Sequence, residues 1–321
     1  MPLHFLSVIL ISIAGAVVTD GCRLEVGSRG QGDASFAITD APADDVDQVR
    51  LTVTAIHLGH ESGDTVRLTL DPAVVIDNLL DLQGTQSQTL FPLDKVRSGD
   101  YEWVRLLISE RDGDSEVRER IGNGGTFPLR LGTSAPGNST RYLQLDTAFR
   151  INANRENRFT LDVDLRRGLI RPNGENFYLL RPSLRLVRNN DAGVIEGTVS
   201  SSLVQAAACD NDLSEDLGNA VYLYSGSNVT PGDIHVNASG QPVNSQRRNP
   251  VTVANVRQGS NGDYRYTLGF VPAGNYTLAF TCQALNDAPN SNQNTSVVGF
   301  PARTNVTVTA GETTQANFNG N

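Results

Sequence analysis

Two aspartates, Asp162 and Asp164, have the residue type and spacing that a general acid and base would need. They alternate with Leu161, Val163 and Leu165, and this alternation predicts a strand with both carboxylates on the face opposite the core. Strand geometry would separate them by roughly 6 to 7 Å, as in hydrolases that use two carboxylates. Acids on a strand face are more commonly solvated or paired with arginine. We expect that state here and keep a carboxylate-dependent hydrolase as the lesser alternative.

Histidine, the usual proton carrier near neutral pH, forms no catalytic pattern in this chain. The mature chain would hold only His57, His60 and His235, and His57 and His60 are three residues apart, so a strand would place them on opposite faces. The sequence has no G-x-S-x-G motif, and no cysteine has a histidine in its sequence context. We therefore predict a protein that is not an enzyme.

Acidic clusters in predicted turns could supply the oxygen ligands that calcium takes. The main candidates are Asp40, Asp44, Asp45 and Asp47 in the first turn, and Asp210, Asp212 and Asp216 in a later one. The later cluster lacks the full EF-hand pattern, because Glu215 stands where the sharp bend requires glycine. Solvated turns are the competing interpretation, so we predict no cofactor, with calcium as the alternative.

A sugar site would need aromatic rings that stand out of a sheet and pack on the sugar ring. Tyr222 and Tyr224 are the candidates, because they share the outer face of one strand if Val221 and Leu223 point into the core. Ordinary strand tyrosines are the competing interpretation. A glycan is therefore an alternative partner, bound through the C-terminal part of the chain.

The N-terminal segment predicts export. Residues 3–18 are apolar except for His4, Ser7 and Ser12, and they are too few for the usual twenty-residue span of about 30 Å of hydrocarbon. Such a run is typical of a secretory signal. The motif AGA at 14–16 fits ordinary signal peptidase, whereas TDGC at 19–22 resembles a bacterial lipoprotein box. We favour a lipid anchor on Cys22, with an unmodified thiol as the alternative.

The two remaining cysteines, Cys209 and Cys282, suit the oxidising compartment that an exported protein enters. Their spacing is not C-x-x-C, which argues against a redox or metal role. We predict that they form a disulfide that stabilises the C-terminal part of the chain.

Composition gives the fold class. The chain has 321 residues with 30 glycines and 14 prolines, and short alternating segments are separated by turn residues throughout. The sequence therefore predicts an all-β protein. The net charge of −9 disfavours nucleic acid as a partner, because binding to phosphates needs a basic surface.

The alternating pattern restarts after the turn-forming residues 189–193, which predicts a domain boundary there. We expect two consecutive β-sandwich domains after an N-terminal signal segment. The predicted divisions are a signal with the lipoprotein box at 1–22, a tether at 23–33, an N-terminal sandwich at 34–188 and a C-terminal sandwich at 194–321.

Five sequence blocks between residues 34 and 188 resemble domain-of-unknown-function family 4382. They are ITDAP at 38–42, IDNLLDL at 76–82, GDYEWVRL at 99–106, LDVDL at 161–165 and LRPSLRL at 180–186. The resemblance implies a secreted bacterial or archaeal protein, often a lipoprotein, and implies no activity. Farther on, GDYRY at 262–266 and VPAGNYTL at 271–278 resemble prealbumin-like and carboxypeptidase-regulatory-like sandwiches, which are grouped under carbohydrate-binding-like folds.

Together these patterns predict an exported, lipid-anchored, non-catalytic envelope protein with a binding or structural role. We expect it in the periplasm or at the cell surface, tethered to a bacterial membrane through its lipid. Its partner would be a glycan or another envelope protein.

Overall fold

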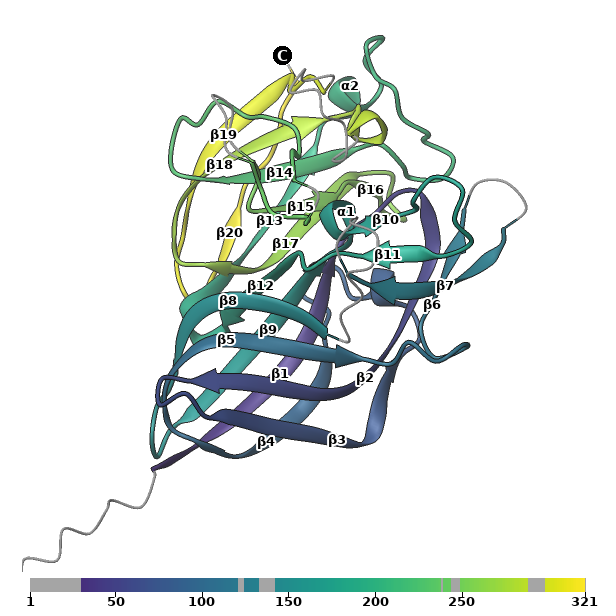
Figure 1. The fold of residues 1–321 in the computed structure, drawn as a ribbon. Helices are drawn as coiled ribbons and strands as arrows, with labels where there is room; N and C mark the ends of the chain where they lie inside the picture. Colours follow the sequence, from purple (N-terminus) through teal and green to yellow (C-terminus); the bar gives the residue numbers. More distant parts are fainter. Residues whose placement is uncertain are drawn as a thin grey trace, which may run out of the picture.

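A computed structural model describes residues 30–120, 124–132, 142–237, 239–243, 249–287 and 298–320. This part of the chain is all-β and forms two sandwiches, as the sequence predicts (Figure 1). Among the described residues, no helix has the length and apolar character needed to cross a membrane.

The first sheet of the N-terminal sandwich has four strands in the order β12-β9-β1-β4. Its strands are β1 (Gln31–Ala41), β4 (Gln88–Arg97), β9 (Glu156–Asp164) and β12 (Leu184–Arg188). Strands β1 and β9 run parallel, in a register that pairs Thr39 with Asp162, whereas β12 runs antiparallel to β9 and pairs Arg185 with Asp162. One face of β9 therefore carries Asp162 and Asp164 away from the core.

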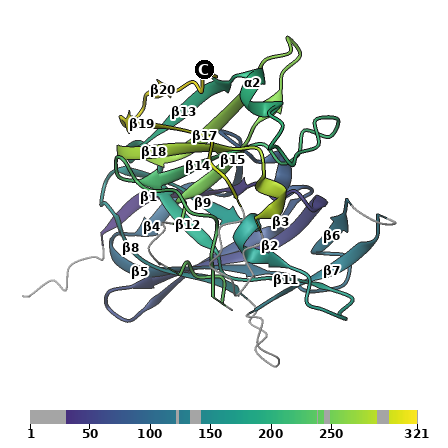
Figure 2. The same cartoon turned by 90° about the horizontal axis from the view of Figure 1, so that it is seen from above.

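The second sheet has the order β10-β11-β7-β6-β2-β5-β8, with β3 also paired to β2. Its strands are β2 (Val46–His60), β3 (Thr65–Ile76), β5 (Gly99–Ile108), β6 (Glu116–Glu119), β7 (Thr126–Leu131), β8 (Tyr142–Ile151), β10 (Leu169–Ile170) and β11 (Tyr178–Leu180). Strands β6, β7 and β11 extend to one side, away from β5 and β8 (Figure 2). Fully buried side chains such as Phe36, Ile38, Leu51 and Phe159 fill the space between the two sheets.

The C-terminal sandwich consists of two four-stranded sheets, β16-β17-β13-β20 and β15-β14-β18-β19. Its strands are β13 (Ala192–Val199), β14 (Ala220–Ser225), β15 (Thr252–Asn255), β16 (Arg257–Gln258), β17 (Tyr264–Pro272), β18 (Gly274–Thr281), β19 (Ala302–Val308) and β20 (Thr313–Gln315). Side chains from both sheets, including Ile195, Val221, Leu223 and Phe280, form its core.

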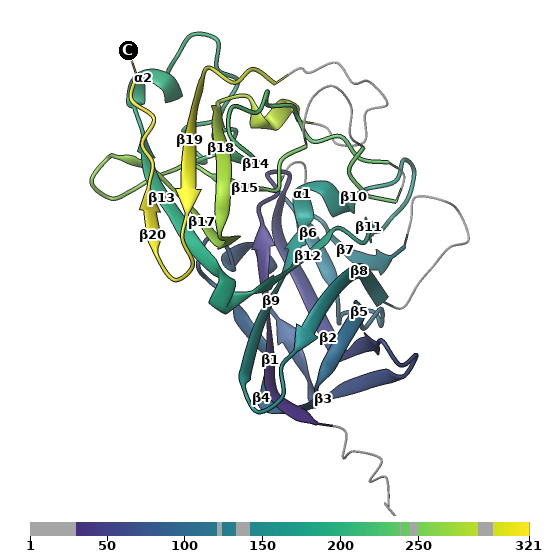
Figure 3. The same cartoon turned by 90° about the vertical axis from the view of Figure 1, so that its left-hand side faces the viewer.

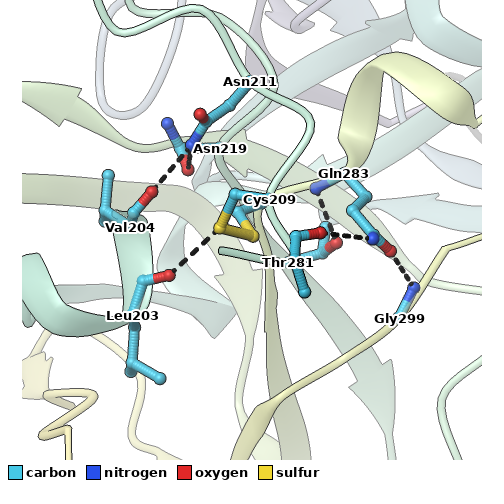
Figure 4. The surroundings of a disulfide bond; sticks show 10 residues. Leu203, Val204, Cys209, Asn211, Asn219, Thr281, Gln283 and Gly299 are labelled. Carbon is cyan, nitrogen blue, oxygen red and sulfur yellow. Dashed lines mark hydrogen bonds between the residues drawn. A yellow bond between two sulfur atoms is a disulfide. The ribbon is translucent and has the colours of Figure 1, made fainter. Parts of the chain in front are cut away.

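A disulfide joins Cys209 to Cys282, which confirms the predicted pairing. It connects the loop after α2 (Ser201–Val204) to the residue that follows β18, and the Cys209 sulfur lies 3.3 Å from the carbonyl oxygen of Leu203 (Figure 4). The disulfide therefore fastens a loop to the edge of the C-terminal core.

In the part of the chain that the structure describes, the helices are single turns. These are η1 (Leu79–Asp81), α1 (Leu165–Gly168), η2 (Asn189–Asp191), α2 (Ser201–Val204) and η3 (Ala284–Asn286). The helix α1 follows β9 directly, and Asp164 caps it by accepting a hydrogen bond from the amide of Arg167. Figures 1 and 3 show α1 at the junction of the two sandwiches.

Candidate functional site

The outer face of β9 is covered by the C-terminal sandwich instead of facing solvent. Asp162 and Asp164 are only 3% and 7% exposed, so the expectation of a solvated face is wrong, although both acids are paired with arginine as predicted. Asp162 Oδ2 lies 2.6 Å from Arg185 Nη2, and Asp164 Oδ2 lies 3.1 Å from Arg167 Nε. Alternation fixed which face carries the acids, but it could not reveal that a second domain packs on that face.

Four arginines of the N-terminal sandwich donate hydrogen bonds to backbone carbonyl oxygens of the C-terminal sandwich. The pairs are Arg166 to Ala284 at 3.1 Å, Arg181 to Asn237 at 3.3 Å, Arg185 to Phe270 at 2.9 Å, and Arg167 to Pro250. A guanidinium group offers five donors in a fixed plane, so one side chain can bind an acid of its own sandwich and a carbonyl of the other. We call this set the arginine joint.

Arg166 is the most enclosed ion-pair partner in the arginine joint. Its Nη2 lies 2.6 Å from Asp44 Oδ2, and the two side chains are only 5% and 2% exposed. Its Nε also donates to the carbonyl oxygen of Pro42 at 3.2 Å. Burial, the largest single influence, would lower the pKa of Arg166, but the nearby acidic groups, Asp44 first and then Tyr222 and Asp287, together outweigh it and raise the pKa. Arg166 therefore stays charged inside the contact between the sandwiches.

Beside the arginine joint lies a cleft of about 230 Å³, which we call the joint cleft. It is lined by side chains of both sandwiches, among them Asp162, Arg185, Arg257 and Arg265. Asp162 Oδ1 is buried and has no hydrogen-bond partner among the described residues. Phe270, which also lines the cleft, has a φ of 52°, a left-handed conformation that is strained for a bulky residue. Unsatisfied polar atoms and backbone strain together mark this cleft as the candidate site.

Asp40 also lines the joint cleft, at the end of β1. Both of its carboxylate oxygens are buried and have no partner among the described residues. Burial raises its pKa well above the ordinary value, and the carboxylates of Asp162 and Asp164 raise it further. The protonated form of Asp40 is therefore favoured more than in an exposed aspartate.

The candidate sugar-binding tyrosines are buried, which contradicts their predicted exposure. Tyr222 and Tyr224 do share one face of β14, but both are 0% exposed and pack with Ile234 and Phe300 in a second small core. The Tyr222 hydroxyl donates to Asp287 Oδ2 at 2.6 Å, and the Tyr224 hydroxyl donates to the carbonyl oxygen of Gly232 at 2.6 Å. Polypeptide after β14 covers this face, so neither ring can stack on a sugar.

The calcium candidates do not converge on common points. In the first cluster, Asp44 pairs with Arg166, Asp47 pairs with Arg120, Asp40 lines the joint cleft and Asp45 lines a different cavity. In the second, Asp210 accepts from Asn286, Asp212 from Ser214, and Asp216 from the amide of Gln258. Within the described ranges, no group of three or more His, Cys, Asp or Glu side chains could hold a metal ion.

His57 and His60 lie on opposite faces of β2, as predicted. His60 is buried, where its ring contacts Ser62 and the ring of Tyr101, whereas His57 is half-buried on the outer face. Cys22 and the rest of the predicted signal and lipoprotein box lie outside the described residues.

Sequence reasoning missed the arginines of the joint. Two of them, Arg166 and Arg167, come directly after the block LDVDL, and Arg185 lies in the block LRPSLRL. Pairing that block against LDVDL in an antiparallel register would have placed Arg185 opposite Asp162, as observed. The contacts with carbonyl groups of the C-terminal sandwich had no signal in the sequence.

Comparison with known proteins gives one family match, to the family described as "Domain of unknown function (DUF4382)" over residues 31–182. It confirms the resemblance seen in the five blocks, and it ends before the C-terminal sandwich, whose prealbumin-like character stays a prediction. No curated protein matches the chain.

Similar solved structures include the TIE protein of Bacillus anthracis, with 12% identity and a TM-score of 0.18 over 89% of this chain and 33% of that one. The minor pilin GBS52 of Streptococcus agalactiae has 12% identity and a TM-score of 0.19, with 89% and 94% covered. The fimbrial anchor protein Mfa2 of Porphyromonas gingivalis has 10% identity and a TM-score of 0.19, with 79% and 80% covered. The chain thus spans about a third of the length of the Bacillus protein, and at these scores none of the three establishes a shared fold or function.

Proposed function

For a chain whose residues 31–182 match the DUF4382 family model, we propose the role of an exported, lipid-anchored, non-catalytic envelope protein that works as one rigid two-sandwich unit and holds a ligand at its joint. The arginine joint carries this proposal. Four guanidinium groups of one sandwich bind carbonyl oxygens of the other, so the two sandwiches present a fixed cleft instead of swinging on a linker.

Export and anchoring are supported by the N-terminal sequence and by the disulfide. The apolar run at 3–18 precedes the TDGC motif, and a bond between Cys209 and Cys282 is expected to persist in an oxidising compartment. A lipid on Cys22 would hold the rigid unit close to a membrane through the segment before β1.

A binding role is supported over catalysis by the state of the acids. Asp162 and Asp164, the pair considered as acid and base, each form an ion pair with an arginine. A catalytic acid needs to hold and release a proton, and a neighbouring guanidinium works against that.

Anchoring is tested by fractionating cells that express the native chain and by mass spectrometry of the mature N-terminus. We expect the protein in the membrane fraction with diacylglycerol on Cys22, and release of a Cys22→Ser variant from that fraction. A mature chain that begins at Val17 would refute the anchor.

Rigidity is tested separately by small-angle scattering of the purified chain. We expect one compact particle whose profile fits the structure, and a broader distance distribution for Arg166→Met. A wild-type profile that requires many relative orientations of the sandwiches would refute the rigid unit.

A further inference from the structure

The floor of the joint cleft offers a hydrogen-bond acceptor that the described residues leave unused. Asp162 receives both Nε and Nη2 of Arg185 on its Oδ2 atom, at 3.1 and 2.6 Å, while its Oδ1 receives nothing. The Asp162 residue is only 3% exposed. A buried carboxylate oxygen without a donor is unfavourable, and a ligand that donates to it would remove that penalty.

The rim of the cleft offers donors from the C-terminal sandwich. Arg257 of β16 and Arg265 of β17 stand directly opposite each other in the register of these antiparallel strands. Arg265 binds Asp263 at 2.8 Å, whereas Arg257 donates to Gln83 Oε1 at 3.2 Å and has no ion pair within the described part of the chain. Like charges placed opposite each other destabilise a strand pair, so an acceptor between them would be favourable.

The ligand has to suit both the acceptor on the floor of the cleft, Asp162 Oδ1, and the cationic donors on its rim. A purely anionic ligand would meet the Asp162 carboxylate, and a purely cationic one would meet three guanidinium groups. A hydroxyl group both donates and accepts, so a neutral molecule with several hydroxyls can satisfy the floor and the rim together.

The size of the cleft limits the ligand to one ring. Its volume of about 230 Å³ equals the share of roughly eight water molecules in the liquid, and it is smaller than the usual pocket for a drug-sized ligand. A single sugar residue, free or at the end of a chain that continues into solvent, matches this size.

We propose that the joint cleft binds one sugar residue of a neutral glycan, with Asp162 Oδ1 accepting a hydrogen bond from one hydroxyl and Arg257 and Arg265 donating to its neighbours. The assignment rests on the proposed binding role of the joint and supplies its ligand class. It places recognition between the sandwiches, and Tyr222 and Tyr224 have no part in it.

Saturation-transfer NMR and calorimetry on the full chain test the assignment, with glucose, galactose, mannose and N-acetylglucosamine as probes. We expect at least one of these sugars to bind. Arg257→Ala and Asp162→Asn should each weaken that sugar about tenfold to a hundredfold, the loss expected for one hydrogen bond to a charged group. Arg158→Ala is the matched control, because Arg158 is an exposed arginine on the same strand as Asp162 and is paired with Glu156. The Arg158→Ala variant should bind the sugar with the affinity of the wild type.

Three results would overturn the assignment. The first is that none of the four sugars binds. The second is that Arg257→Ala binds the sugar as tightly as the wild type does. The third is that glycine or citrate binds although none of the sugars does. Asp162→Asn removes a charge beside Arg185 and has to be checked for folding, but Arg257 is exposed and its variant keeps the test decisive. Loss of the Cys22 anchor would refute export to the membrane while leaving sugar binding intact, so failure of the proposed function and failure of this assignment are distinguishable.

Discussion

Replacing Arg166 by methionine should release the two sandwiches from each other. The change keeps an apolar stem of similar length but removes the charge that balances Asp44, whose side chain is 2% exposed. It also removes the donors to the carbonyl oxygens of Pro42 and Ala284. Leaving one partner of a buried ion pair uncompensated costs about 3 to 5 kcal/mol, so we expect the free energy of unfolding to fall by that amount.

The single tryptophan makes the assay specific for one sandwich. Trp103 lies on β5 of the N-terminal sandwich, so its fluorescence follows that unit, whereas far-ultraviolet circular dichroism follows the strands of both. In the wild type we expect the two signals to change together during urea unfolding. In Arg166→Met both midpoints should fall and the two transitions should separate, because the sandwiches no longer stabilise each other.

Arg150 provides the control for charge removal. It pairs with Asp100 at 2.5 Å within the N-terminal sandwich, but the two side chains are 59% and 48% exposed. Surface pairs of this kind contribute at most about 1 kcal/mol, so Arg150→Met should leave the transitions nearly unchanged. If Arg166→Met shifts the midpoints no more than Arg150→Met does, the joint does not depend on its buried ion pair.

Three further changes test other parts of the structure. Burial raises the pKa of Asp287 to about 6, so its protonated form stabilises the fold fully below about pH 4 and this contribution is lost as the pH rises through about 6. Between pH 4 and 7, urea unfolding should show the wild type losing about 2 kcal/mol relative to Asp287→Asn; parallel profiles would contradict this. Replacing Cys209 and Cys282 by serine opens a link between residues 73 apart and should lower stability by about 4 kcal/mol in thermal melts, and a reductant should have the same effect on the wild type but none on the variant. Gly269→Ala would place a Cβ 1.9 Å from the carbonyl oxygen of Gly84, across the two sandwiches, and should lower the unfolding midpoint; an unchanged midpoint would show that the loop at Gly84 moves freely.

The fold class was predictable because alternation acts locally. Leu161 and Val163 point into the core, Asp162 and Asp164 point away from it, and the structure keeps this division. The disulfide was predictable for a similar reason, since only two cysteines remain after the N-terminal segment. The first inference depends only on residues adjacent in the sequence, and the second only on the number of cysteines. Neither requires knowing which surfaces of the two sandwiches pack together.

The candidate site was not predictable from alternation, because a face opposite one core can be the face of another contact. Asp162 points away from the N-terminal core and meets the C-terminal sandwich, and Tyr222 points away from the C-terminal core and meets the polypeptide that covers β14. In both cases the alternation of side chains along the strand predicted the correct face of the strand, but it wrongly predicted that this face is exposed to solvent. Which outer faces become buried depends on tertiary packing between segments far apart in the sequence.

Arginine suits the joint because each side chain there has to bind backbone carbonyl oxygens and, in most cases, a carboxylate. Backbone carbonyl oxygens at the edge of a sandwich need donors, and the acids on β9 and at Asp44 need cations. Lysine donates from a single nitrogen on a flexible stem, whereas the planar guanidinium of Arg166 or Arg185 donates from separate nitrogens and reaches both partners in one fixed geometry. Arg185→Lys should therefore keep the charge beside Asp162 and still loosen the joint at Phe270, which the separation of the Trp103 fluorescence and circular dichroism transitions would reveal. Coincident transitions in that variant would mean that charge alone, without the fork of donors, holds the sandwiches together.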